Sequence, residues 1–369
     1  MVNQSFWQGK RVFLTGHTGF KGAWLSLWLS QLGAKVTGYA LDPATTPNLF
    51  ELLQLNKVVD SHIGDINDAA NLFRVLDEAN PDIVIHMAAQ PFVGESYRDP
   101  VGTFQTNIVG TVNLLEAIRK ANQKGAKIKV VLNVTTDKCY ENVESIWGYR
   151  ETDPLGGKDP YSVSKACSEL VTKSYRDSFF HPLKIAEHGV AIASARAGNV
   201  IGGGDWSSER LIPQCIDSLM ANKPIFLRRP NAIRPWQHVV EPLSGYLQLV
   251  EKLYEEGAAY TSAWNFGPDF ADCRPVREIV EKLISIWGGQ LKLEKYEQPL
   301  YPESDLLLLD CTKSKSQLSW HPVWRVDQAI EKIVEWHRAY EKNEDMLKIS
   351  IQQLEQFMLD QNVRCHSHG

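Results

Sequence analysis

The sequence has no hydrophobic run long enough to cross a lipid bilayer. Its longest apolar stretches, such as residues 23–29, are far shorter than the roughly 20 residues of a membrane helix, and residues 1–10 lack the apolar core of a signal peptide. An excess of positive charge is also missing, since 39 Lys and Arg against 44 Asp and Glu give a formal net charge of −5. This balance offers no general attraction to nucleic acid or anionic lipid. We therefore expect a cytoplasmic protein that binds neither membranes nor nucleic acid.

Cysteine pairs at metal-ligand spacing are absent as well. None of the six cysteines forms a Cys-x-x-Cys motif, which excludes the usual zinc and redox motifs. The even number would allow disulfides, but free thiols are the expectation for a large chain without a secretion signal. We predict no metal site. The six are Cys139, Cys167, Cys215, Cys273, Cys311 and Cys365.

Residues 10–38 have the pattern of a strand, a glycine-rich turn, a helix and a second strand. An apolar run over Arg11–Thr15 leads into a turn with three glycines, apolar residues recur at helical spacing to Leu32, and a second run covers Val36–Leu41. Glycines often mark only a turn. Between a strand and a helix they also let the backbone approach a pyrophosphate, which lies on the N–H groups at the helix start. We predict a dinucleotide site with contacts from Gly16, Thr18, Gly19, Phe20, Lys21 and Gly22.

The end of the second strand indicates which dinucleotide is bound. Asp42 follows this strand, where a carboxylate accepts hydrogen bonds from an adenosine ribose, although an aspartate there is also a common turn former. No Lys or Arg occurs from Val36 to Asn56, so this region has no cation of its own for a 2′-phosphate. The pattern favours NAD over NADP, with His17 and Lys21 as the residues that could reverse the preference.

Apolar runs and helical patterns go on alternating through the first half of the chain, which predicts repeated βα units. Such units form an α/β fold with a Rossmann-type doubly wound parallel sheet, whose ligands lie at the carboxyl ends of the strands. The further strands are expected over Val58–Ile63, Asp82–His86, Ile128–Thr135 and Val190–Ala193, and the helices over Asp68–Ala79, Thr103–Asn122 and Asp159–Phe179.

The length of 369 residues exceeds one comfortable hydrophobic core, which predicts two lobes. After Asn199, prolines divide the sequence into short elements, as in a smaller α+β lobe for substrate. We expect a cofactor domain over 1–200 with a returning segment at about 236–266, the smaller lobe over 201–235 and 267–345, and a tail over 346–369. Helices are expected over Glu241–Glu256 and Val326–Tyr340, and the tail is expected to be helical to Leu359 and frayed beyond.

Tyr161 and Lys165 carry the sharpest local signal for chemistry. Because they are four residues apart on a predicted helix, the ammonium group is expected near the phenol and within reach of a cofactor ribose. A phenol with an ordinary pKa of about 10 acts as a base near neutrality only where positive neighbours stabilise the phenolate. Lys165 and an oxidised nicotinamide are two such neighbours. The same spacing also occurs by chance on helix surfaces, but here it follows a glycine turn.

A cluster of polar residues ends the predicted strand over Ile128–Thr135. The hydroxyl of Thr136 is expected to bind the reacting oxygen of a substrate opposite Tyr161, and the carboxyl of Asp137 and the amine of Lys138 come next. Without the other motifs, a loop with an ordinary ion pair would be the preferred interpretation.

Several strings together resemble one known family. The glycine turn, residues 86–90 (HMAAQ), residues 107–111 (NIVGT), the Thr-Asp-Lys string and the Tyr–Lys pair are similar to the extended short-chain dehydrogenase/reductase family of nucleotide-sugar enzymes. The resemblance covers the chain from Lys10 to Trp336. Residues 196–206 (RAGNVIGGGDW) and 233–238 (IRPWQH) are more specific and resemble its 4,6-dehydratases that act on CDP-glucose. Related dehydratases carry Glu in place of Lys138, which leaves the elimination base open.

The resemblance implies NAD-dependent dehydration of CDP-D-glucose to CDP-4-dehydro-6-deoxy-D-glucose, an entry to the deoxysugars of lipopolysaccharide O-antigens. In this reaction Tyr161 takes the proton of the C4 hydroxyl as C4 is oxidised, and Asp137, kept protonated by burial, donates to the departing C6 hydroxyl. Lys138 is either the base at C5 or a charged group that stabilises the enolate. The resemblance also assigns cofactor binding to Asp42, Asp65, Ile66, Ala88, Ala89, Gln90, Asn107, Thr135, Tyr161 and Lys165, and substrate binding to Ser96, Asn199, Arg210, Leu211 and Arg234.

Other functions stay open on the same fold. A nucleotide-sugar 4-epimerase needs no acid and base beside the tyrosine, so Asp137 and Lys138 argue against it, while a dehydratase for another nucleotide remains an alternative. A non-catalytic NAD-sensing protein is disfavoured by the intact Thr136, Tyr161 and Lys165. The four-helix bundle of the family implies a homodimer or homotetramer, and the helices over 103–122 and 159–179 carry apolar residues on more than one side.

Overall fold

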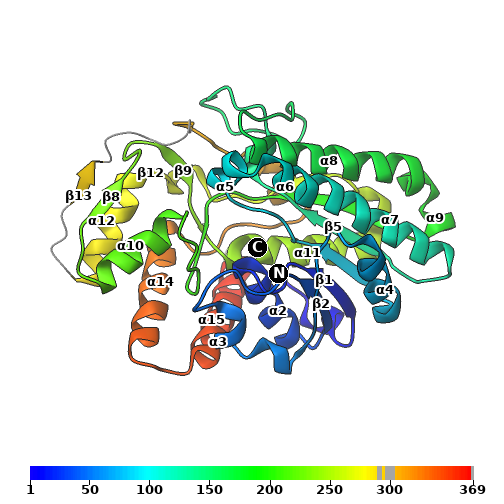
Figure 1. Ribbon diagram of the computed structural model, residues 1–369, viewed down its shortest axis with the longest axis horizontal. Helices are drawn as coiled ribbons and strands as arrows, with labels where there is room; N and C mark the ends of the chain where they lie inside the picture. Colours follow the sequence, from blue (N-terminus) through cyan, green and yellow to red (C-terminus); the bar gives the residue numbers. More distant parts are fainter. Residues whose placement is uncertain (289–292, 296–303, 367–369) are drawn as a thin grey trace.

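The structure, a computed structural model that describes residues 1–288, 293–295 and 304–366, is built around a sheet of seven strands (Figure 1). The strand order is β11-β6-β5-β4-β1-β2-β3, and every pairing in this sheet is parallel. The Rossmann-type doubly wound sheet predicted from the alternating pattern is therefore confirmed. Its strands are β1 (Arg11–Thr15), β2 (Lys35–Ala40), β3 (Val59–Ile63), β4 (Ile83–His86), β5 (Val130–Val134), β6 (Ala191–Arg196) and β11 (Ala263–Asn265).

Helices cover both faces of this sheet because successive side chains of its central strands point to opposite faces and both sets are mostly apolar. Leu14 of β1 belongs to one core with α2 (Phe20–Gln31) and α11 (Val240–Glu256). Its neighbour Phe13 belongs to a second core with α4 (Ala69–Ala79) and α7 (Gly110–Gln123). The long helix α8 (Pro160–Phe179) packs beside α7 (Figure 1). With both faces covered, the carboxyl ends of the strands are the place for a ligand site.

The helix expected over Thr103–Asn122 is interrupted. The chain forms α6 (Pro100–Phe104), a π-helical turn, η2 (Gln105–Val109), and then α7. A π-turn adds one residue to a helical turn and so changes which side chains face inward, and it is frequent at functional sites. The turn buries Asn107, whose side-chain amide donates to the carbonyl of Gln90.

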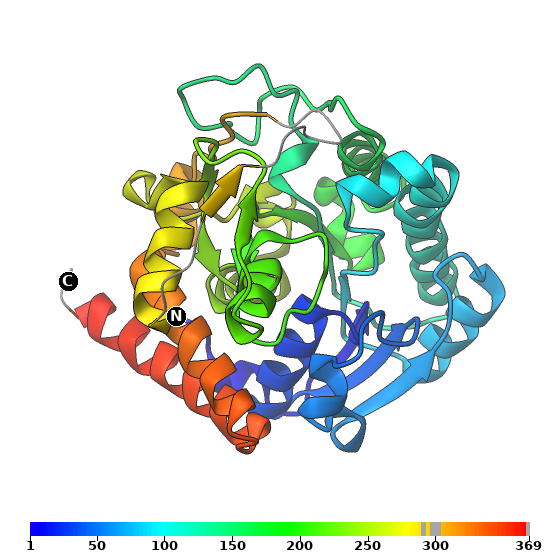
Figure 2. The ribbon, with the colours of Figure 1, turned by 60° about the vertical axis from the view of Figure 1, so that its left-hand side comes forward.

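A third hydrophobic core lies in the part of the chain that follows β6. It is formed by α10 (Leu211–Met220), α12 (Val276–Trp287) and α14 (Val326–Glu341), with short strand pairs beside them (Figure 2). Between these elements the chain returns to the main sheet through α11 and β11, within the segment expected to return. The proposed domain boundaries themselves stay a prediction. The short strands are β7 (Val200–Ile201), β8 (Ile225–Leu227), β9 (Ile233–Pro235), β10 (Gln237–His238), β12 (Cys273–Pro275) and β13 (Leu293–Lys295).

The tail is more ordered than the sequence suggests. Helix α15 (Met346–His366) runs beyond Leu359, where we expected fraying, so that prediction is wrong. The physical reason lies in contacts beyond Leu359, because the Asp360 carboxylate accepts from the Trp324 indole N–H at 2.7 Å and buried Gln361 accepts from the backbone N–H of Val2. The remaining helical elements are α1 (Gln4–Trp7), α3 (Leu49–Leu52), η1 (Leu55–Lys57), α5 (Val93–Arg98), η3 (Asp137–Cys139), η4 (Pro182–Lys184), α9 (Ile185–His188), η5 (Gly257–Tyr260), η6 (Phe270–Asp272) and α13 (Thr312–Gln317).

Two expectations about the chain as a whole concern cysteines and membranes. The five cysteines whose side chains are described are free thiols. The side chain of the sixth, Cys365, is not among those that the structure describes. Among the helices described, none has both the length and the hydropathy to cross a membrane.

Candidate active site

A cavity of about 1280 Å³ lies at the carboxyl ends of the strands and extends toward the third core. It brings together residues that are far apart in sequence. The predicted residues that line it are Gly16, Thr18, Gly19, Phe20, Lys21, Gly22, Asp42, Asp65, Ile66, Ala88, Ala89, Thr135, Thr136, Asp137, Lys138, Tyr161, Lys165, Asn199, Arg210, Leu211 and Arg234.

Three predicted contact residues, Gln90, Ser96 and Asn107, are not among those that line the cavity. Asn107 accepts from the backbone N–H of Gln90 at 2.8 Å and donates to its carbonyl at 3.0 Å. Ser96 is fully buried, and its hydroxyl donates to the carbonyl of Val93. These side chains hold the backbone of the cavity wall. Their predicted direct contacts with cofactor or substrate stay predictions.

The glycine turn forms a close backbone approach. Gly16 has a φ of +77°, and a Cβ there would lie 2.7 Å from the backbone nitrogen of Ala88. A Cβ on Gly22 would lie 2.0 Å from the carbonyl oxygen of Gly16. The turn therefore accepts no side chain at either position. Helix α2 begins directly after it, so that unpaired N–H groups at its start point toward the cavity, as a pyrophosphate requires.

Helix α8 presents Tyr161 from its first turn. The Asp159 carboxylate accepts from the backbone N–H of Ser162 at 2.9 Å and Pro160 occupies the first helical position, so the helix begins one residue before Tyr161. Burial raises the pKa of Tyr161 to about 12, and a hydrogen bond with Thr136 only partly opposes this. The expectation that Lys165 and an oxidised nicotinamide together stabilise the phenolate stays a prediction.

Lys165 lies one turn further along α8 and is fixed by the sheet. Its ammonium donates to the carbonyl of Val134 at 3.1 Å, at the end of β5. Burial lowers the pKa of Lys165 to about 8, and the negative charge of Glu169 opposes this shift. The amine therefore stays mostly charged near neutrality, but its contact is to a strand carbonyl and not to the phenol.

Asp137 is a buried carboxyl with one oxygen unpaired. Its Oδ1 accepts from the hydroxyl of Thr136 at 3.0 Å, while Oδ2 has no hydrogen-bond partner among the described residues. The residue is 1% exposed. Because buried polar atoms almost always have a partner, an unpaired oxygen at a cavity wall is suited to a ligand. Lys138, next in the chain, forms no ion pair with any described residue.

Positive charge surrounds this carboxyl. The Lys21 ammonium donates to the hydroxyl of Tyr246 at 3.1 Å, and burial with the charges of Arg210 and Lys165 lowers the pKa of Lys21 to about 7. Arg210 pairs with Asp205 at 2.9 Å. The hydrogen bond from Lys21 to Tyr246 was not predicted, since Tyr246 lies in α11, far from every motif in sequence.

Guanidinium groups gather at the other end of the cavity. Arg234, which the sequence singled out, donates to the carbonyls of Ile233 and Asp305. Arg228 and Arg229 also line the cavity, although no motif pointed to them. Such a group of cations is suited to paired phosphate oxygens.

The comparisons with known proteins place this chain in a family. The family model described as "GDP-mannose 4,6 dehydratase" matches residues 13–333. The chain belongs to the GDP-mannose 4,6-dehydratase family. This family membership fits the resemblance to nucleotide-sugar enzymes found in the motifs.

Individual proteins similar to this chain are also nucleotide-sugar dehydratases. The CDP-glucose 4,6-dehydratase of Salmonella typhimurium is 51% identical over 360 residues, which is 97% of this chain and 99% of that protein. A dTDP-glucose 4,6-dehydratase of Xanthomonas campestris is 28% identical over 88% of this chain and 92% of that protein.

Solved structures share the fold of this dehydratase family member. The dTDP-glucose 4,6-dehydratase DesIV of Streptomyces venezuelae, solved with NAD bound, has a TM-score of 0.76 at 22% identity and covers 91% of this chain and 99% of its own. The UDP-glucose 4-epimerase of Thermotoga maritima has a TM-score of 0.74 at 22% identity, with coverage of 89% and 99%. At such identities the likeness concerns the fold alone.

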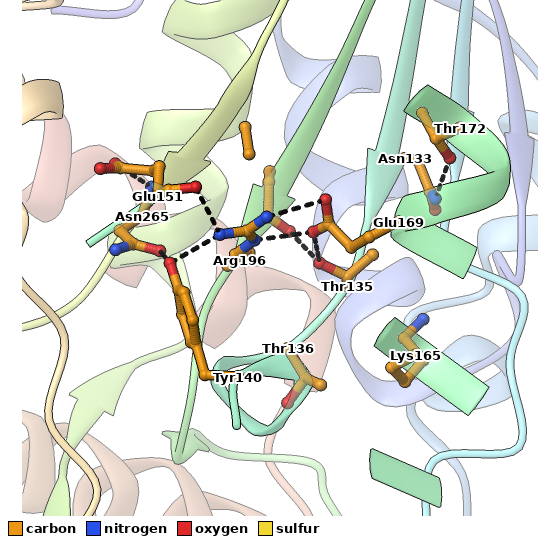
Figure 3. Close-up of polar contacts among 12 residues, drawn as sticks. Asn133, Thr135, Thr136, Tyr140, Glu151, Lys165, Glu169, Thr172, Arg196 and Asn265 are labelled. Carbon is orange, nitrogen blue, oxygen red and sulfur yellow. Dashed lines mark hydrogen bonds and ion pairs between the residues drawn. The ribbon is translucent and has the colours of Figure 1, made fainter. Parts of the chain in front are cut away.

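This dehydratase family member also has a buried ion pair that sequence motifs did not reveal. Glu169 of α8 and Arg196 at the end of β6 pair behind the strand end that carries Thr135 and Thr136 (Figure 3). Two signals in the sequence could have indicated it: Glu169 follows Lys165 at helical spacing, and Arg196 begins the string at residues 196–206.

Proposed function

We propose that this protein is an NAD-dependent CDP-glucose 4,6-dehydratase, a hydro-lyase that makes CDP-4-dehydro-6-deoxy-D-glucose. One observation carries the proposal: Thr136, Asp137, Lys138 and Tyr161 line the same cavity as the glycine turn. The 51% identity to the Salmonella enzyme over 97% of the chain supports CDP-glucose as the substrate.

The residues of the cavity fit NAD. The glycine turn, which accepts no Cβ at Gly16 or Gly22, would hold the pyrophosphate, Asp42 the adenosine ribose, and Asp65 with Ile66 the adenine. When bound, NAD supplies the hydride acceptor for oxidation at C4 and the hydride donor for the final reduction at C6. Because the cofactor is regenerated in each turnover, we expect the chain to hold it tightly.

Tyr161 takes the proton of the C4 hydroxyl in the first step. Since the pKa of Tyr161 is about 12 in the chain itself, a positive charge beside the phenol is needed before it acts as a base. The hydroxyl of Thr136, hydrogen-bonded to the phenol, holds the same substrate oxygen. Lys165, fixed to the Val134 carbonyl, supplies charge nearby.

Asp137 and Lys138 act in the elimination. A ketone at C4 makes the C5 hydrogen acidic, and Asp137 donates a proton to the departing C6 hydroxyl through its unpaired Oδ2. Lys138 either takes the C5 proton or stabilises the enolate with its charge. Both roles stay open. Arg234 holds the pyrophosphate of the sugar nucleotide, beside Asn199 and Leu211.

We further propose that the enzyme works in the cytoplasm as a homodimer or homotetramer and supplies deoxysugar precursors for lipopolysaccharide O-antigen. Exposed apolar side chains on α8 and on the π-helical turn η2 before α7 support an interface between copies. Val109, Leu170 and Phe179 are 47%, 53% and 51% exposed.

The test uses CDP-glucose deuterated at C4. Deuterium recovered at C6 of a 4-keto product is the expected result, because hydride leaves C4 and returns to C6 of the same sugar. A galacto product would indicate a 4-epimerase instead. Faster turnover of dTDP-glucose or UDP-glucose than of CDP-glucose would contradict the assigned nucleotide.

A further inference from the structure

The buried ion pair behind the cavity is bidentate and dry. Arg196 Nε lies 2.9 Å from Glu169 Oε1, and Arg196 Nη2 lies 3.1 Å from Glu169 Oε2 (Figure 3). The two side chains are 3% and 4% exposed, and neither lines the cavity. Removing two charges from water costs so much that apolar side chains would stabilise this position equally well. Stability alone therefore does not explain the pair.

The pair holds both ends of the loop that carries the catalytic groups. Glu169 Oε1 accepts from the hydroxyl of Thr135 at 2.6 Å, and Arg196 Nη1 donates to the hydroxyl of Tyr140 at 2.7 Å (Figure 3). Thr135 and Tyr140 flank residues 136–139, which include Asp137 and Lys138. The two ends of this loop are thus fixed to one rigid group on α8 and β6.

A further contact anchors the Tyr140 end. The Tyr140 hydroxyl donates to Asn265 Oδ1 at 2.7 Å, and the backbone N–H of Asn265 donates to the carboxylate of Glu151 at 2.8 Å (Figure 3). The Arg196 guanidinium also lies 4.7 Å from the centre of the Tyr140 ring. Strands β6 and β11 therefore both contribute to the position of the loop.

The charge of Glu169 reaches the active site as well. Burial raises the pKa of Glu169, but the charge and hydrogen bonds of Arg196 outweigh it and hold this pKa below its ordinary value. The resulting carboxylate opposes the loss of the Lys165 proton. The other titratable groups that face Lys165 are Cys139 from η3, Lys21 from α2 and His86 from β4.

We propose that Glu169 and Arg196 are positioning residues that hold the loop 135–140 at both ends and thereby place Asp137 and Lys138 for the elimination. This role rests on the proposed dehydratase function and deepens it. Tyr161 stands on α8 and not on the loop. Asp137 and Lys138, which act in the elimination, stand on the loop, so the pair should slow loss of water most. Oxidation at C4 should slow less, through Thr136 on the loop and the charge of Lys165.

The test replaces both charges together with apolar side chains of similar size, E169M/R196M, in the full-length protein with NAD. We expect a protein that melts close to the parent, because a buried pair exchanged as a unit is tolerated. The value of kcat should fall at least about 10-fold with KM within about threefold, since misplacement by about 1 Å costs up to about 100-fold. Reduced nicotinamide, followed by its near-ultraviolet absorbance, should accumulate because elimination slows more than oxidation.

A second variant and a control keep the outcome clear. Y140F leaves the ion pair intact but removes the contact at one end of the loop, and we expect kcat to fall by about 3-fold to 10-fold without a change in KM. L76A weakens the core under α4, away from the cavity, and should lower the melting temperature without accumulation of reduced nicotinamide. Parental kcat in Y140F, or in a folded E169M/R196M, would overturn the proposal.

The activity of the unsubstituted protein tests the proposed function, and the ratios of variant to parent rates test the positioning role. All variant rates are divided by the parent rate on whichever nucleotide-glucose the parent converts. Failure on CDP-glucose alone therefore refutes the nucleotide assignment, while unchanged variant-to-parent ratios refute the positioning role.

Discussion

The unpaired carboxyl of Asp137 lies against a glycine, and this contact gives a sharp test of its role as the acid. A Cβ on Gly198 would lie 1.7 Å from Asp137 Oδ2, whereas real Cβ contacts are not shorter than 3.0 Å. Gly198 has no positive φ, so alanine is compatible with the backbone there. The carboxylate is the flexible end of a side chain and would move by more than about 1 Å, a displacement that typically costs on the order of 100-fold in rate.

We therefore expect G198A to fold and to oxidise C4 but to eliminate water about 100-fold more slowly. Stopped-flow absorbance of the reduced nicotinamide measures both steps, and it should rise and persist in the variant. G267A is a matched control, because a Cβ there meets Cys311 Sγ at 3.3 Å and lies outside the cavity wall. Turnover of G198A within about threefold of the control would refute the role of Asp137, as would an equal loss of both steps.

Three further predictions concern single side chains. Y161F should lose oxidation at C4 by about 100-fold or more, and substantial formation of reduced nicotinamide in this variant would remove Tyr161 from its role. K138A should lose exchange of the C5 hydrogen with solvent while C4 oxidation persists; K138R should restore exchange if Lys138 acts by charge, and not if it is the base. Burial raises the pKa of Glu251 to about 7 although Trp7 donates to it, so the folded protein binds more protons than the unfolded chain between about pH 4.5 and 7. Stability should fall as pH rises through this window, and E251Q should make the slope shallower and be about 1–3 kcal/mol more stable at pH 8 by urea unfolding. Glu241, whose pKa burial raises to about 8, keeps part of the slope; an unchanged slope in E251Q would contradict the reasoning.

Much of the fold follows from local patterns. The runs over β1, β4, β5 and β6 are mostly apolar on both faces because the sheet is covered twice, so they stand out from the polar turns that bound them. The edge strand β3 buries only Val59. Strand β11 has only three residues and no such run, and the segment was expected only to return to the sheet. The π-turn η2 left no trace in the helical pattern, because one added residue changes the spacing of apolar positions little.

The candidate site also contains residues that the sequence predicts and residues that only the structure reveals. The glycine turn, the Thr-Asp-Lys string and the Tyr–Lys pair are short, and their chemistry depends on residue type and spacing, so the sequence alone predicts them. Tyr246, Arg228, Arg229 and Glu169 belong to no motif, and Arg196 begins the string at residues 196–206 without a role of its own predicted for it. Their roles depend on which elements meet, as α11 meets α2 through Tyr246 and Lys21.

The sequence by itself determined the fold class, the nucleotide-sugar family and the residues able to transfer protons, because βα periodicity and short motifs are local properties of the chain. Only the tertiary structure decided how these groups behave. The pKa of Tyr161 rises and that of Lys165 falls because both are buried, and Asp137 Oδ2 fits its place because Gly198, from another strand end, has no Cβ there. Burial and long-range contacts are set when distant segments pack, and no local pattern contains them.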